Sequence, residues 1–263
     1  MHVVVCMKQI PDLEKIRIKA DTREPVLEGV PARFGDWDKS AVEAAVRIKE
    51  AGGEVKVTAV AIGSAKLKDT IKEALAIGAD EAVILTDRAF EGCDEAGTAR
   101  TLAKVMAKLG EFDLILMGEG SADDHTGQVP ARLAEMLGLP QVTYARELQV
   151  LEGNLIRAAR DLEEALEIVD LALPAVVSVT GEIATPRLPP LTAILKAARK
   201  STQTWGPGDI GLDPGEVGAA AATVRLISNL APAQARKQLV LEGSADEVVD
   251  ELLKALEREG VLA

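Results

Sequence analysis

Continuous runs of apolar residues constrain the fold of this chain more than any other feature of its sequence. A run without alternation is typical of a strand buried on both faces, as in a parallel sheet. Between these runs, apolar residues recur three and four positions apart, which predicts amphipathic helices. The runs are His2–Met7, Val55–Ile62, Ala82–Thr86 and Leu114–Met117, and the helical segments are Lys39–Ala51, Leu67–Ile77 and Gly97–Leu109. This order predicts a doubly wound, mostly parallel and Rossmann-like α/β sheet, with a ligand site beyond the carboxyl ends of its strands.

The pattern changes after Pro140. Shorter stretches joined by turns predict antiparallel additions to the sheet, at Val142–Val150, Asn154–Arg160, Leu166–Leu171 and Ala175–Val179. Trp205–Ala222 is rich in Gly, Pro and Ala, which indicates a linker. Ala245–Glu259 predicts an amphipathic helix, begun by Ser244 and ended by Gly260. We therefore expect a nucleotide-binding domain over residues 1–204, and over residues 205–263 a linker and an arm whose helix packs on another protein.

Charge and composition exclude several classes of function. The net charge of −12 argues against nucleic-acid partners, because neutralising phosphates needs a basic surface. No window approaches the roughly 20 apolar residues of a membrane span, and the first residues do not form a signal peptide. We therefore expect a cytoplasmic protein without membrane insertion. Cys6 and Cys93 match no metal-ligand spacing, so no metal site is expected. His2 and His125 are the only histidines and no hydrolase motif accompanies them, so no catalytic residue is assigned.

The loop after the fourth apolar run is the most informative segment. It reads Gly118-Glu-Gly-Ser-Ala-Asp-Asp-His-Thr-Gly-Gln-Val-Pro130 and opens a predicted helix over Ala131–Leu137. Small residues let a ligand approach the backbone, and the free N–H groups of a helix N-terminus suit a phosphate or diphosphate. An ordinary helix cap formed by Asp123, Asp124 or Thr126 explains this loop about equally well.

Two other segments follow strands of the same sheet. Phe34–Ser40, which contains Asp36, opens the first long helix, and Ala61–Ala65, which contains Gly63, ends the second apolar run. In Phe34–Ser40, too, ordinary cap residues are an alternative explanation. Because all three loops are expected at one edge of a parallel sheet, together they favour a nucleotide site.

At these residues the chain resembles the electron-transfer flavoprotein beta family, from its first strand to about Lys200. The resembling segments are Cys6–Asp12, Ala41–Glu50, Ala74–Asp80, Arg160–Glu163 with Glu167, Pro174–Ser178, Pro186–Pro189 and Lys196–Lys200. The sequence departs from the family pattern at Glu164-Ala165, at Gly35–Asp38 and at Pro130. Several ordered matches are more specific than any single motif.

The resemblance implies a partner and a cofactor. In this family the beta subunit pairs with an alpha subunit that carries the electron-transferring FAD. The beta subunit itself holds either AMP, as a structural ligand, or a second FAD, which takes a hydride from NADH and splits the electron pair in flavin-based bifurcation. Thr126-Gly127-Gln128-Val129 resembles the bifurcating branch more than the AMP-binding one, so we favour FAD. The protein would supply binding and orientation, and the flavin the electron chemistry.

The resemblance also implies site residues. By resemblance, the residues that contact the adenylate part of the cofactor are Cys6, Lys8, Ile62, Gly63, Asp123, Thr126, Gly127, Gln128 and Val129. Asp36 and Gly118, from the loops described above, complete the cofactor-binding candidates. Arg187 and Leu191 lie on the segment that docks dehydrogenase or quinone-reducing partners in the family. A core leucine at the start of a helix explains Leu191 about equally well. Two alternatives remain: an AMP-binding scaffold subunit of the same family, and a stand-alone regulator that binds an adenine nucleotide on a similar sheet.

Overall fold

The computed structural model describes residues 1–233 and 238–262 of the chain. These residues form two compact units. Unit 1 comprises Met1–Arg17 and Val26–Ser228, and unit 2 comprises Ile18–Pro25 and the described residues from Asn229 onward.

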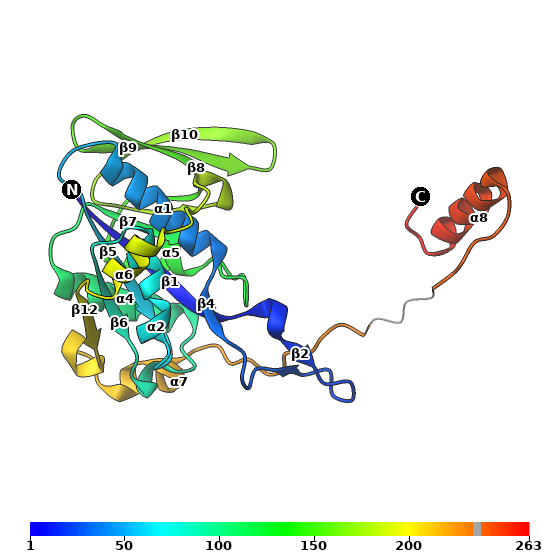
Figure 1. Ribbon diagram of the computed structural model, residues 1–263, viewed down its shortest axis with the longest axis horizontal. Coiled ribbons are helices and arrows are strands. Elements are labelled where there is room, and N and C mark those ends of the chain that lie inside the picture. Colours follow the sequence, from blue (N-terminus) through cyan, green and yellow to red (C-terminus); the bar gives the residue numbers. More distant parts are fainter. Residues whose placement is uncertain (234–237, 263) are drawn as a thin grey trace. The chain divides into compact units, whose positions relative to one another are not determined.

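Unit 1 is built on a mixed ten-stranded sheet, with strands in the order β10-β9-β8-β11-β7-β1-β5-β6-β12 and β4 paired to β1 (Figure 1). The strands are β1 (His2–Pro11), β4 (Ala32–Phe34), β5 (Lys56–Ile62), β6 (Glu81–Leu85), β7 (Leu114–Gly118), β8 (Gln141–Leu151), β9 (Leu155–Leu162), β10 (Ala165–Ala172), β11 (Ala175–Val179) and β12 (Thr202–Trp205). From β8 and β11 across to β12 the neighbouring strands are parallel, whereas β8, β9 and β10 pair antiparallel. The short strands β2 (Arg17–Ile18) and β3 (Pro25–Val26) form a separate pair.

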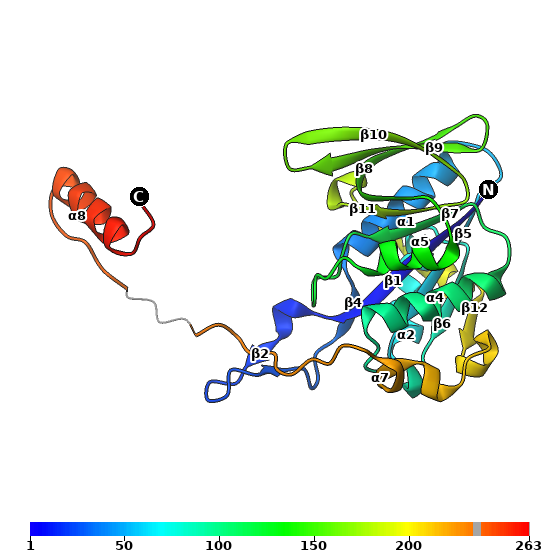
Figure 2. The ribbon, with the colours of Figure 1, turned by 180° about the vertical axis from the view of Figure 1, so that it is seen from behind.

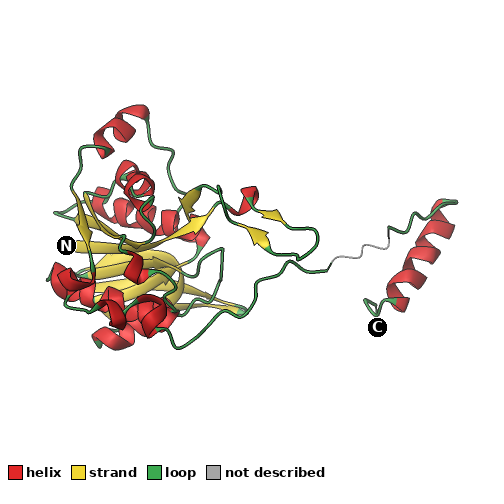
Figure 3. Cartoon of the chain, turned by 90° about the horizontal axis from the view of Figure 1, so that it is seen from below, coloured by secondary structure: helices red, strands yellow, loops and turns green. Residues whose placement is uncertain are grey.

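Helices cover both faces of this sheet, so unit 1 has three layers (Figure 3). On one face lie α1 (Asp36–Glu50), α2 (Leu67–Thr70), α3 (Lys72–Ile77) and α6 (Leu191–Ala197). On the other face lie α4 (Glu95–Leu109) and α5 (Val129–Leu137), which are seen in front of the sheet in Figure 2. Successive side chains of β1 point alternately into the two hydrophobic cores, one on each face of the sheet. Val3 and Val5 pack with α1, and Val4 and Cys6 pack with α4 and α5. Short helical turns lie at Leu13–Lys15, Arg88–Phe90, Gly181–Ile183, Pro207–Ile210, Pro214–Glu216 and Gly218–Ala221.

The strands and helices expected before Pro140 are confirmed, with small shifts. The segment Leu67–Ile77 forms two helices that meet at Ile71 rather than one helix. Beyond Pro140, the antiparallel additions are confirmed for β8, β9 and β10. Ala175–Val179 differs, because β11 pairs parallel with both β7 and β8 and thereby belongs to the parallel part of the sheet.

The interpretation of Trp205–Ala222 as a linker is wrong. Trp205 ends β12, which pairs with β6, and the Lys108 ammonium lies 4.4 Å from the centre of its ring. Ile210, Leu212 and Val217 are buried in the same core as α4. Gly and Pro here form tight turns between buried side chains, so unit 1 continues to Ser228 and not to residue 204.

Unit 2 contains α8 (Ala245–Arg258), close to the helix expected at Ala245–Glu259. Ser244 and Glu247 form a reciprocal capping box, with the Ser244 N–H donating to Glu247 Oε2 at 2.8 Å. Gly260 follows the helix with a φ of +69°, the left-handed conformation that commonly ends a helix. The apolar residues of α8 include Val249, Leu252 and Leu253, and these three side chains are exposed. Within the described ranges, no helix combines the length and apolar character that a membrane crossing requires.

Candidate functional site

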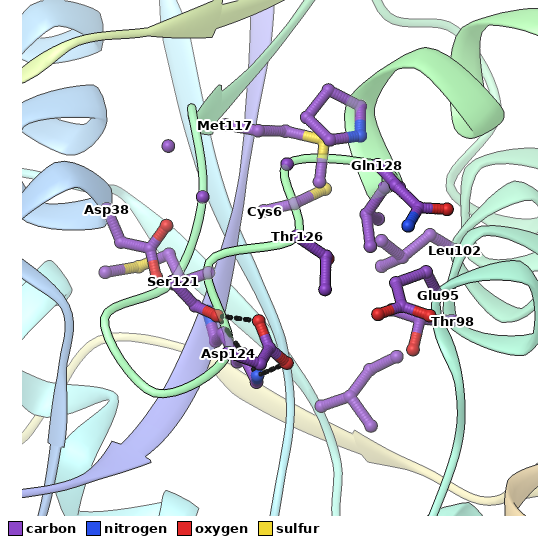
Figure 4. A pocket seen from close by; sticks show the side chains of 18 of the residues that line it. Cys6, Asp38, Glu95, Thr98, Leu102, Met117, Ser121, Asp124, Thr126 and Gln128 are labelled. Atoms are coloured by element: carbon purple, nitrogen blue, oxygen red, sulfur yellow. Dashed lines mark hydrogen bonds and ion pairs between the residues drawn. The ribbon is translucent and has the colours of Figure 1, made fainter. Parts of the chain in front are cut away.

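A cavity of about 190 Å³ opens where the strand order reverses (Figure 4). β1 lies between β5, which follows it in the chain, and β7, which comes later, so the connections after β5 and β7 leave the sheet in opposite directions. The cavity is lined by the ends of β1, β5 and β7 and by the first turns of α1, α4 and α5. The lining residues are Cys6, Met7, Lys8, Asp38, Ile62, Cys93, Asp94, Glu95, Thr98, Leu102, Met117, Gly118, Gly120, Ser121, Asp124, Thr126, Gly127, Gln128, Val129 and Pro130.

The start of α5 offers free backbone donors to this cavity. Gly127 has a φ of +63°, and Gln128 follows in the right-handed helical conformation. Successive residues of opposite hand turn their N–H groups into one concavity, a geometry that binds anions. The N–H groups of Gly127, Gln128 and Val129 have no acceptor among the residues that the structure describes. No side chain caps α5, and its first turn contains no acidic residue. This helix start can therefore receive a phosphate.

Asp38 holds the two central strands to α1 at the edge of the cavity. Its Oδ2 accepts a hydrogen bond from the Lys8 N–H at 2.8 Å, and the Gly118 N–H also donates to this carboxylate. Burial raises the pKa of Asp38 to about 7, against the lowering effect of these hydrogen bonds. Gly118 permits the approach, because an added Cβ would lie 2.8 Å from Asp38 Oδ1 and 2.9 Å from Trp37 Cβ.

The Lys8 ammonium is held by the loop after β7. It donates to Asp123 at 2.9 Å. It also donates to Asp124 at 2.6 Å and to the Ser121 hydroxyl at 3.1 Å (Figure 4). Burial lowers the pKa of Lys8, but the two carboxylates outweigh it and the net shift is upward. Lys8 therefore fixes the loop that carries the free N–H groups.

The first turn of α4 forms the opposite side of the cavity, and the sequence analysis missed it. Asp94 caps α4, with Oδ1 accepting from the Gly97 N–H at 2.7 Å. Its Oδ2 accepts from the Thr223 N–H at 2.7 Å, the Thr223 hydroxyl at 2.8 Å and the Val224 N–H at 3.1 Å. The Gly97 bond, followed by those from Thr223 and Val224, holds the pKa of Asp94 at about 2. One sequence signal could have revealed it. The acidic pair Asp94-Glu95 starts the helix that follows β6, and β6 is a further strand of the parallel set.

Most of the expected cofactor residues meet at this cavity. Those that line it are Cys6, Lys8, Ile62, Gly118, Thr126, Gly127, Gln128 and Val129. Three expected residues do not line it. Asp123 reaches the site only through Lys8, and Gly63 packs against Gln9, whose Oε1 would lie 2.8 Å from an added Cβ. Burial raises the pKa of the Cys6 thiol well above its usual range, with a further contribution from Asp38, so Cys6 is a neutral wall residue.

Asp36 is not brought to the cavity. It is exposed and forms an ion pair with Arg33, while Asp38, two residues later, lines the site. Because α1 begins at Asp36 and not at Lys39, the two side chains are separated by about 200° around the helix axis. His125 lies outside the cavity, with its ring centre 5.0 Å from that of Trp37.

The expected docking residues lie elsewhere on unit 1. The Arg187 guanidinium binds Glu43 at 2.8 and 2.9 Å and Glu50 at 2.6 and 2.8 Å, so it is engaged within the unit. Leu191, the first residue of α6, is 70% exposed. Leu188, Ile194 and Leu195 are also exposed, so an apolar surface surrounds Leu191.

The fold and the cavity define this chain as a doubly wound α/β protein with a ligand-binding switch point. Residues 26–209 match the electron transfer flavoprotein domain. An electron transfer flavoprotein subunit beta from Thermoanaerobacterium thermosaccharolyticum is 34% identical over 263 residues, covering 100% of both chains. A subunit of the same name from Clostridium acetobutylicum is 37% identical and covers 83% of each chain. The caffeyl-CoA reductase-Etf complex subunit CarD of Acetobacterium woodii is 31% identical over 100% of both chains. The chain belongs to the electron-transfer flavoprotein beta-subunit family.

Proposed function

We propose that this chain pairs with an electron-transfer flavoprotein alpha subunit in the cytoplasm, binds the adenylate part of FAD, and takes part in bifurcating electron transfer from NADH. The observation that carries the nucleotide assignment is the set of free N–H groups of Gly127, Gln128 and Val129, three residues that line the cavity at the switch point. A phosphate placed there would accept their hydrogen bonds and complete the unsatisfied start of α5.

The size of the cavity supports partial enclosure of a dinucleotide. Its volume of about 190 Å³ lies below the range of roughly 300–1,000 Å³ that is usual for sites enclosing a whole small ligand. An adenylate group could occupy it while the flavin half of FAD lies outside, toward a partner subunit. A bound flavin would supply hydride and single-electron chemistry, and this chain would hold its phosphate and keep the surrounding loops in place.

The likeness of Thr126–Val129 to the bifurcating branch supports FAD over AMP. A stand-alone regulator is disfavoured, because the three relatives cover 83–100% of this chain and each is named as a subunit.

The decisive experiment is to purify the alpha–beta complex, denature it and quantify the released nucleotides. We expect two FAD per complex. One FAD and one AMP would support the structural AMP role instead, and no nucleotide beyond the FAD of the alpha subunit would overturn the assignment of the cavity.

A matched pair of glycine variants tests the location. Gly127 and Gly138 lie at opposite ends of α5 with φ of +63° and +64°, so valine strains the backbone similarly at both. An added Cβ at Gly127 would lie 3.1 Å from the Glu119 carbonyl oxygen, whereas at Gly138 it meets nothing within 4 Å. We expect Gly127→Val to lose the nucleotide and Gly138→Val to retain it. Equal retention by both variants would exclude the α5 start as the phosphate site.

The second part of the proposal concerns redox partners. We place their docking surface at Leu188, Leu191, Ile194 and Leu195, with Arg187 positioning the segment on α1 through Glu43 and Glu50. Leu191→Ala should weaken partner affinity by about 2 kcal/mol, roughly thirtyfold, with the nucleotide content unchanged. Ile227→Ala, at another exposed apolar residue of unit 1, is the control. Equal effects of the two substitutions would remove Leu191 from the docking surface.

The third part concerns α8, which we propose packs on the alpha subunit. Val249, Leu252 and Leu253 lie three and four positions apart and are 45–53% exposed. Burying such an apolar stripe against a partner is favourable. A triple substitution of these residues to serine should lower the yield of the heterodimer, and an unchanged yield would contradict the packing.

A further inference from the structure

The α4 side of the cavity carries two side chains that take no part in the hydrogen bonding of the protein. Glu95 and Thr98 line the cavity and lie across from Thr126 (Figure 4). Neither the Glu95 carboxylate nor the Thr98 hydroxyl has a hydrogen-bond or ion-pair partner within residues 1–233 and 238–262. Asp94, their neighbour, is fully engaged by Gly97, Thr223 and Val224. Glu95 and Thr98 are therefore available to a ligand.

The two sides of the cavity differ in the chemistry that they accept. The α5 side presents free N–H donors and suits an anion. The α4 side presents the Glu95 carboxylate, which repels an anion and can accept hydrogen bonds, beside the negatively charged but fully engaged Asp94. A ligand that bridges the cavity must therefore place a negative group at α5 and hydrogen-bond donors at α4.

We propose that Glu95 and Thr98 bind the ribose hydroxyls of the adenosine group and thereby select nucleotides with a free 2′-hydroxyl. This inference rests on the nucleotide site proposed above. A carboxylate can accept hydrogen bonds from both hydroxyls of a ribose, as acidic residues do in other dinucleotide sites. A 2′-phosphate would bring negative charge against Glu95, with the Asp94 carboxylate beside it. The site therefore accepts AMP, ADP or FAD and rejects their 2′-phosphorylated counterparts.

The test is calorimetric titration of the alpha–beta complex, after removal of its adenine nucleotide, with three probes: AMP, 2′-deoxy-AMP and adenosine 2′,5′-bisphosphate. The wild-type complex should bind 2′-deoxy-AMP roughly tenfold more weakly than AMP, because a hydrogen bond to a charged group is lost. It should bind the bisphosphate at least roughly tenfold more weakly, with a discrimination that decreases as salt is added.

Two variants assign the effect to these side chains. Glu95→Gln keeps the size of the side chain and removes its charge, so discrimination against the bisphosphate should fall roughly tenfold. Thr98→Val keeps the shape and removes the hydroxyl, so it should reduce the preference for AMP over 2′-deoxy-AMP and leave the bisphosphate ratio unchanged. A general loss of folding would weaken all three probes equally and would not alter these ratios.

The outcomes separate this inference from the proposed function. Suppose that the wild-type complex binds AMP and the bisphosphate equally well, and that Gly127→Val abolishes AMP binding. This result would overturn the ribose assignment and leave the phosphate site intact. Discrimination that persists in Glu95→Gln would likewise overturn the role of Glu95. Failure of the wild-type complex to bind any of the three probes would overturn the nucleotide site and this inference with it.

Discussion

The helices α4 and α5 pack on the same face of the sheet and begin at the same cavity, but their first turns differ in charge and in hydrogen bonding. The start of α4 is satisfied by its own Asp94 and carries Glu95, whereas the start of α5 has neither a side-chain cap nor an acidic residue. Unsatisfied N–H groups at a helix start cost stability unless water or a ligand binds them. The difference indicates that α4 is completed by the protein and that α5 is completed by what it binds.

Removing the cap of α4 should have the largest effect on stability. Asp94→Ala breaks the bond to Gly97 and leaves the donors of Thr223 and Val224 without their acceptor. We expect a loss of about 3 kcal/mol in the free energy of unfolding, measured by urea denaturation at pH 7. Gln128→Ala, at the uncapped start of α5, is the matched control and should cost less than about 0.5 kcal/mol. Similar losses in both variants would contradict the comparison.

The same contrast should be visible in acid. The folded pKa of Asp94 is about 2, below the ordinary value of 3.8, so its contribution is fully present above about pH 4. That contribution, about 2 kcal/mol, is lost as the pH falls through 2. Asp94→Asn should remove this part of the acid dependence when unfolding is measured between pH 2 and 5. A variant that follows the wild-type curve would show that Asp94 is not held as a carboxylate.

Giving α5 the charge of α4 should weaken binding without harming the fold. Gln128→Asp places a carboxylate beside the free N–H groups, where it would repel a phosphate. We expect AMP affinity of the nucleotide-free complex to fall roughly tenfold, about 1.4 kcal/mol, in calorimetric titration. Gln128→Asn has nearly the same shape without the charge and should change the affinity much less. Equal affinities for the two variants would argue against an anion at this helix start.

The smallest effect on stability is expected at Lys8. Its side chain is 42% exposed and its partners Asp123 and Asp124 are 24% and 47% exposed, so solvent screens these ion pairs. Lys8→Met should lower the free energy of unfolding by only about 0.5 kcal/mol, measured by urea denaturation. It should also make the loop after β7 more susceptible to limited proteolysis. A loss of several kcal/mol would show that Lys8 supports the core rather than the loop.

The central sheet could be predicted because its strands are buried on both faces. Runs such as Val3–Val5 must be apolar throughout, which leaves a signal in the sequence. The segment after β12 leaves no such signal, since Ile210, Leu212 and Val217 are isolated among turn-forming residues and their burial depends on α4. The strand β4 was missed for a similar reason: it is three residues long and is defined by its pairing with β1.

The part of the candidate site that lies on loops directly after predicted strands could be predicted from the sequence. The loop Gly118–Pro130 was found because small residues follow a buried strand. The choice between Asp36 and Asp38 required knowing that α1 already begins at Asp36, because two residues of a helix that are two positions apart lie on nearly opposite sides of it. Glu95 and Thr98 resemble ordinary residues of an amphipathic helix, and only the position of β6 in the sheet brings them to the cavity.

The position of β1 between β5 and β7 also matters while the chain is being synthesised. β1 pairs with residues 56–62 on one side and with residues 114–117 on the other, and both partners are translated after it. At roughly 5–20 residues per second, its second neighbour is made many seconds after β1 itself. During that interval the edge of β1 that later pairs with β7 has no strand beside it. The backbone N–H and C=O groups on that edge of β1 therefore remain without their partners in the sheet until β7 has left the ribosome.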